Sequence, residues 1–134
     1  MIHARVSTLI LAAALTAACM TPAQADDTPS VTFSKDIAPI FHEKCGTCHR
    51  PGGVAPMSLL DYKSSRPWAK SIRARVVART MPPWHAAPSA RPFKNDISLT
   101  DDEIDLIVSW VAGGSPQGDP ALLPDVPDYE ALAR

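Results

Sequence analysis

Residues 44–50, "KCGTCHR", contain the side chains whose types and spacing are best suited to chemistry. Cys45 and Cys48 are separated by two residues, and His49 follows the second cysteine directly. Cysteine pairs at this spacing are typical of redox dithiols, of zinc sites and of the attachment points of c-type hemes. A plain disulfide beside an unrelated histidine is the simplest structural explanation, but it gives His49 no role.

A zinc site and a redox dithiol each need partners that the sequence does not offer in a suitable place. Zinc sites need about four ligands, commonly from two cysteine or cysteine–histidine pairs. His49 adjoins Cys48, which is an awkward arrangement for binding one tetrahedral ion, and His42 and His85 are the other histidines beyond the N-terminal leader. Thioredoxin-like dithiols follow a strand in a βαβ unit, whereas the flanks of this motif predict no strand.

A heme accounts for all three residues of the motif. Two thiols separated by two residues on a helical turn can bind the two vinyl groups of one porphyrin, and the next residue then projects under the iron. The motif therefore predicts one covalent heme c, attached through Cys45 and Cys48, with His49 as the proximal iron ligand.

The N-terminus predicts export. Residues 1–25 combine Arg5, an apolar run over residues 9–18 and the small-residue pattern Ala23-Gln24-Ala25, which together are typical of a cleaved signal peptide. Cys19 follows small residues in "LTAAC", and cleavage before it would instead give a lipoprotein. Both routes lead to an oxidising compartment. We expect a periplasmic protein, with a membrane tether only if Cys19 is lipidated.

Length and composition limit the remaining possibilities. The chain has 134 residues, which is enough for the signal peptide and one domain. The net charge of -1 gives no reason to expect nucleic-acid binding. Fourteen prolines imply short helices and long ordered loops. We predict one all-α domain over residues 26–134, with a core over about 33–114 and an extended, proline-rich tail over 115–134.

The hydrophobic pattern predicts helices on both sides of the motif. Their expected ranges are 36–49, about 58–64, 66–80 and 100–114, and a helical turn is allowed near residues 129–133. Asp36 is the expected N-cap of the first helix, with Pro39 in its first turn. Thr100 and Glu103 form a capping box at the start of the last helix.

Apolar stripes on the two later long helices are expected to form the core. The stripe of the third helix comprises Trp68, Ala69, Ile72 and Val76. The stripe of the last helix comprises Ile104, Ile107, Val108 and Val111, joined at its edge by Trp110. We expect Trp110 to contact the first helix.

These features together resemble the class I cytochrome c domain over about residues 33–114. The resemblance rests on a first helix ending in "CGTCH", a Gly/Pro loop, a later "MPP" and a last helix "LTDDEIDLIVSWV". It implies a small fold whose N- and C-terminal helices cross around one covalent heme, with "APMSL" on the proximal side. The "RTMPPWHA" to "WVAGGSPQGD" stretch is similar to a bacterial subgroup of small cytochrome domains, which also occur fused or adjacent to larger oxidoreductases.

The second iron ligand lies outside the motif. Met81 follows His49 by 32 residues, in a loop stiffened by Pro82 and Pro83, so the chain has room to reach the opposite heme face. We predict Met81 as the distal ligand, with His85 or an open, water-filled position as the alternatives.

Other side chains are expected to support the heme. A backbone carbonyl near residues 51–56 should accept the second N–H of His49, while Met57 packs on the proximal side. His42, on the attachment helix, is expected to face solvent or the heme edge. Candidate donors to the heme propionates are Trp68, Arg73, Arg79 and Trp84.

The expected function is one-electron transfer to and from a redox partner protein in the periplasm, by a protein that is not itself an enzyme. Every charged residue from 62 to 95 is basic, whereas residues 96–130 hold nine acidic and no basic residues, so we expect a strong dipole. The alternatives are the electron-transfer subunit of a periplasmic dehydrogenase or oxidase, and a heme sensor or peroxidase-like protein with an open iron.

Overall fold

The computed structural model describes residues 30–84, 86 and 93–132. This part of the chain is helical and contains no strand, which confirms the all-α prediction. The predicted signal peptide, Cys19 and His85 lie outside the described residues.

The first helix begins earlier than predicted. It consists of a π-helical turn η1 (Phe33–Ile37), a short α-helical stretch α1 (Ala38–Ile40) and a second π-helical turn η2 (Phe41–Cys45). Asp36 is not the N-cap, because its carboxylate lies inside the first turn and accepts a hydrogen bond of 2.8 Å from the Thr32 N–H. Pro39 has no N–H to offer the preceding turn, which disfavours regular α-helical hydrogen bonding here. The helix ends at Cys45, and the rest of the motif forms a turn.

Three short elements follow the motif loop. They are α2 (Tyr62–Ser65), the 3₁₀ turn η3 (Arg66–Trp68) and α3 (Ala69–Val77). α2 begins later than the predicted range because the Asp61 side chain accepts the Ser64 N–H at 2.9 Å and acts as its N-cap.

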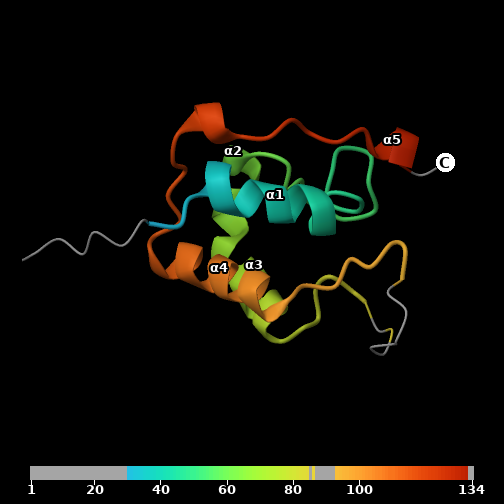
Figure 1. Cartoon of the computed structure of the whole chain (residues 1–134), viewed down its shortest axis with the longest axis horizontal. Coiled ribbons are helices and arrows are strands. Elements are labelled where there is room, and N and C mark those ends of the chain that lie inside the picture. Colours follow the sequence, from blue (N-terminus) through green and yellow to red (C-terminus); the bar gives the residue numbers. More distant parts are fainter. Residues whose placement is uncertain (1–29, 85, 87–92, 133–134) are drawn as a thin grey trace, which may run out of the picture.

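The last long helix matches its prediction closely. α4 (Asp101–Ala112) begins with the predicted capping box, in which the Thr100 side chain accepts the Glu103 N–H and the Glu103 carboxylate accepts the Thr100 N–H. α4 packs against both η1 and α3. Figure 1 shows α4 running beneath the first helix, so that the first and last helices face each other across the core.

An aromatic cluster joins the first and last helices. Trp110 is fully buried, with its ring centroid 5.9 Å from that of Phe33 and 6.2 Å from that of Phe41. Its indole N–H donates to the Pro116 carbonyl at 3.0 Å. The predicted contact of Trp110 with the first helix is confirmed. Trp110 belongs to the buried stripe and not to its edge, whereas Val108 and Val111 of the predicted stripe are only partly buried.

The stripe on α3 is narrower than predicted. Ala69, Ile72 and Val76 are buried, but Trp68 is 44% exposed. Trp68 belongs to the preceding 3₁₀ turn, whose different periodicity rotates its side chain away from the buried face of α3.

The tail wraps the surface, as predicted. The N–H groups of Phe33 and Ser34 donate to the carbonyls of Pro116 and Gln117 at 3.0 and 2.9 Å, which ties the start of the tail to η1. The tail then forms η4 (Pro120–Leu122) and ends in α5 (Tyr129–Leu132). Figure 1 shows it returning along the side of the first helix opposite to α4, towards the loop that follows the motif.

Candidate functional site

The motif forms one tight turn. The Cys45 carbonyl accepts hydrogen bonds from the N–H groups of Cys48 at 3.1 Å and of His49 at 2.9 Å. This turn brings the three predicted attachment and ligand residues together at the end of the first helix. Both thiols are free and half-buried.

His49 is held in one orientation by the loop that follows it. Its Nδ1 lies 3.1 Å from the Met57 carbonyl oxygen, so Nδ1 carries the hydrogen and donates. The acceptor was predicted near residues 51–56 and lies one residue later, at Met57. A histidine fixed through Nδ1 presents the lone pair of Nε2, which is the form of imidazole that binds a metal ion.

Two glycines allow this loop to pass close to the motif. A Cβ atom on Gly53 would lie 2.3 Å from the Cys48 carbonyl oxygen. Gly52 has a φ of +74°, which favours glycine. The backbone therefore approaches closely at Gly53 and not at Gly52, where an added Cβ would meet no atom within 4 Å. The Ala55 N–H bonds to the same Cys48 carbonyl at 3.1 Å.

His42 is buried, contrary to the prediction that it faces solvent or a heme edge. It is 3% exposed, and its Nε2 donates to the Leu60 carbonyl at 2.8 Å. Ser34, Ala38 and His42 are all buried and recur every fourth residue, as the buried face of a helix does. This spacing could have predicted that His42 is buried, but two of the three side chains are polar and were not assigned to the core. His42 therefore ties the first helix to the segment that precedes α2.

The environment of Cys45 does not suit a reactive thiolate. Burial raises the pKa of the Cys45 thiol to about 12, and the neighbouring Cys48 and Glu103 add to the shift. Redox-active and nucleophilic cysteines need a lowered pKa, because the thiolate is the reacting form. Burial of Cys45 thus works against the thiolate form that a redox-active or nucleophilic cysteine needs at this position.

Met81 lies in the loop that follows α3. Its side chain is 42% exposed and lines a shallow pocket with the buried side chains of Val76, Leu99 and Ile104. Figure 1 shows the loop after α3, in yellow, at the same end of the molecule as the motif loop, in green. The pocket that Met81 lines includes neither His49 nor the two cysteines of the motif.

One side chain connects the motif helix to the chain entering α4. Lys44 Nζ lies 2.9 Å from the Glu43 carboxylate and donates to the Asp96 carbonyl at 3.4 Å. Burial opposes the charged form, but the bond to Glu43 and the nearby acids outweigh it, so the pKa of Lys44 lies above its usual value. Lys44 thereby anchors the segment that leads into α4 beside the end of the first helix.

The candidate propionate donors differ in their surroundings. Arg79 donates to the Asp101 carboxylate and, at 3.4 Å, to the Leu99 carbonyl. The Trp84 ring packs edge-on against Phe93, with 5.7 Å between the centroids. Arg73 and Trp68 are exposed. Arg79 and Trp84 line the same pocket as Met81, whereas Trp68 and Arg73 do not.

Sequence reasoning missed one residue at the motif. Tyr129, from α5, lies on the motif turn and donates to the His42 carbonyl at 2.8 Å. No local pattern marked it, because it is separated from its partner by 87 residues and follows an irregular tail.

Comparisons with models of protein families, with curated proteins and with solved structures gave no match. In residues 30–84, 86 and 93–132 no helix is both long and apolar enough to span a bilayer. Within the same part of the chain, no three histidine, cysteine or acidic side chains gather as a metal-binding group.

Proposed function

We propose that this protein is an exported monoheme cytochrome c that carries single electrons between redox partners in the periplasm. The observation that carries the proposal is the contact of 3.1 Å between His49 Nδ1 and the Met57 carbonyl. It leaves Nε2 free on the same turn as two free thiols. A disulfide or a redox dithiol gives this histidine orientation no purpose. A zinc site would need about four ligands, and within the described residues no three histidine, cysteine or acidic side chains gather as a metal-binding group.

The residues present fit a covalent heme. Cys45 and Cys48 would hold it through two thioether bonds, and His49 would be the proximal ligand. The Met57 carbonyl fixes the plane of the imidazole and makes Nε2 a better electron donor. Once bound, the heme supplies reversible one-electron exchange at its iron.

Met81 is the proposed distal ligand. Its partial exposure, beside the buried side chains of Val76 and Leu99, leaves the thioether available to a ligand rather than consumed by core packing. Histidine and methionine together give a higher potential than two histidines. This suits an electron carrier with a fairly oxidising potential.

The attachment is tested by producing the mature chain in a host with heme-attachment machinery. We expect heme colour that survives denaturing electrophoresis and a hemochrome spectrum typical of two thioethers. Cys48→Ser should change that spectrum, and His49→Ala should abolish the low-spin form. A chain that stays colourless in such a host, while a control cytochrome is loaded, would refute the proposal.

The distal ligand needs a separate test. Met81→Ala should remove the near-infrared band that arises from methionine bound to ferric iron and should open the iron to added cyanide or imidazole. Met57→Ala is the matched control, because it removes a methionine expected on the other side. If the band persists in Met81→Ala, Met81 is not the ligand.

The charge distribution supports a partner with an acidic surface. Basic side chains are exposed on and before α3, among them Lys63, Arg66, Lys70, Arg73 and Arg75. Such a patch steers encounters with an acidic protein, so the rate of electron exchange should fall as salt concentration rises. A rate that is independent of salt would argue for a permanently bound subunit.

A further inference from the structure

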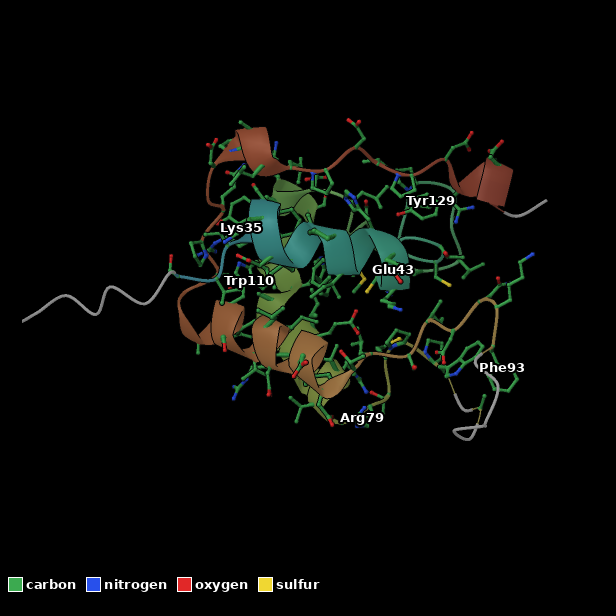
Figure 2. The ribbon with its side chains drawn as sticks, viewed as in Figure 1. Lys35, Glu43, Arg79, Phe93, Trp110 and Tyr129 are labelled. Atoms are coloured by element: carbon green, nitrogen blue, oxygen red, sulfur yellow. The ribbon has the colours of Figure 1, made fainter. Side chains whose placement is uncertain are left out.

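The end of the tail is fastened onto the motif turn by one side chain. Tyr129 is 8% exposed, and its hydroxyl donates to the His42 carbonyl at 2.8 Å. A Cβ atom on Gly46 would lie 1.9 Å from the same hydroxyl, so only glycine leaves room for this ring. Figure 2 shows Tyr129 on the last part of the tail, beside the loop that follows the motif helix.

The bond supplies a donor that the helix itself does not provide. The Gly46 N–H bonds to the Phe41 carbonyl at 2.8 Å, and the next bonds of the turn go to the Cys45 carbonyl. The backbone N–H groups of this turn therefore bond to other carbonyls and not to that of His42, which instead accepts the hydrogen bond from the Tyr129 hydroxyl. Unpaired buried carbonyls are unfavourable, so the tail stabilises the end of the helix at the point where the motif begins.

The same tyrosine also holds a cation next to the predicted proximal ligand. The Arg50 guanidinium lies 5.2 Å from the centre of the Tyr129 ring, within cation–π range. Arg50 also donates to the Thr47 carbonyl. Arg50 directly follows His49, so both contacts fix a positive charge against the turn that carries the imidazole.

We propose that residues 119–132 of the tail form a strap that Tyr129 fastens to the motif turn. Tyr129 is then a positioning residue that keeps Arg50 beside His49. The redox part of this inference rests on the proposed heme function. A fixed positive charge near an iron centre favours the reduced state, which carries one positive charge fewer. With the strap closed, Arg50 raises the reduction potential; with the strap open, Arg50 moves into water and its effect is screened.

Strap closure is tested by hydrogen exchange on the full mature chain. Tyr129→Phe removes the hydroxyl and Gly46→Ala displaces the ring. Tyr62→Phe is the matched control, because the Tyr62 hydroxyl donates to the Ser115 carbonyl at 2.9 Å, a bond of the same kind in another place. Both strap variants should exchange about fivefold faster in peptides that cover residues 42–50 and 126–132. Equal exchange in Tyr129→Phe and Tyr62→Phe would overturn the strap.

The positioning role is tested by a double-mutant cycle on the reduction potential of the heme-loaded protein. Arg50→Gln should lower the potential in the parent, and Tyr129→Ala should lower it too. In the Tyr129→Ala background, Arg50→Gln should have a clearly smaller effect, because Arg50 has already lost its contact with the ring and keeps only its bond to the Thr47 carbonyl. Equal shifts in both backgrounds would refute a role through Arg50. A chain that carries no heme would refute the proposed function, while the exchange experiment would still decide the strap.

Discussion

Replacing Trp110 with phenylalanine tests whether the first and last helices are held together as the structure indicates. The change removes the indole N–H that donates to the Pro116 carbonyl at 3.0 Å. It also removes part of a fully buried ring that packs against Phe33 and Phe41. Figure 2 shows Trp110 between the first helix and α4.

The expected loss of stability follows from these two terms. An acceptor left without its donor costs about 1–3 kcal/mol, and the smaller ring adds about 1–2 kcal/mol as a partly filled cavity. We expect a loss of roughly 2–5 kcal/mol in the free energy of unfolding. A domain of this size shifts its Tm by about 4–8 °C per kcal/mol, so the Tm should fall by at least about 8 °C.

The assays are thermal unfolding, which gives the Tm, and equilibrium unfolding in guanidinium chloride, which gives the free energy of unfolding, both followed by far-ultraviolet circular dichroism. Trp68→Phe is the matched control, because Trp68 is 44% exposed and its replacement should change stability by less than about 0.5 kcal/mol. If both variants unfold at the same midpoint, Trp110 does not hold the two helices together. If Trp68→Phe proves the more damaging change, the sequence-based stripe was right and the observed rotation of Trp68 is wrong.

Three further predictions concern the motif turn and the loop that follows it. Gly53→Ala should destabilise the protein by about 1–3 kcal/mol and reduce the yield of attached heme, because its Cβ meets the Cys48 carbonyl at 2.3 Å. Gly52→Ala should lower stability by about 1–2 kcal/mol, because Gly52 has a positive φ, and should leave the yield of attached heme unchanged. Equal yields of attached heme for Gly53→Ala and Gly52→Ala would contradict the special role of Gly53. In the heme-free chain, burial raises the pKa of the Cys45 thiol from 9.0 to about 12. Between these two pH values the unfolded chain loses the thiol proton and the folded protein keeps it. The contribution of the buried thiol to folding stability is therefore complete below pH 9 and is lost as the pH rises through 12. Unfolding titrations should show a loss of about 1.4 kcal/mol at pH 10 relative to Cys45→Ser, and parallel pH profiles would exclude this burial.

Much of the local structure could be predicted from the sequence, because it depends on neighbours in the chain. The capping box at Thr100 and Glu103 and the close approach at Gly53 need only short-range geometry. The carbonyl that holds His49 was misplaced by one residue, since the exact closure of a loop depends on how its turns stack. The start of the first helix was also misplaced, because Asp36 can cap a helix or bond back to Thr32 with similar ease.

The sequence by itself determined which reactive groups are present, two thiols and an imidazole within five residues, and that the chain around them is helical. Only the tertiary structure decided which side chains surround the motif turn. It buried His42 and turned Trp68 outwards, because burial depends on what packs opposite each face. It brought Tyr129 onto the motif across 87 residues. No local pattern encodes such a contact, since it forms only when the tail folds back over the completed helices.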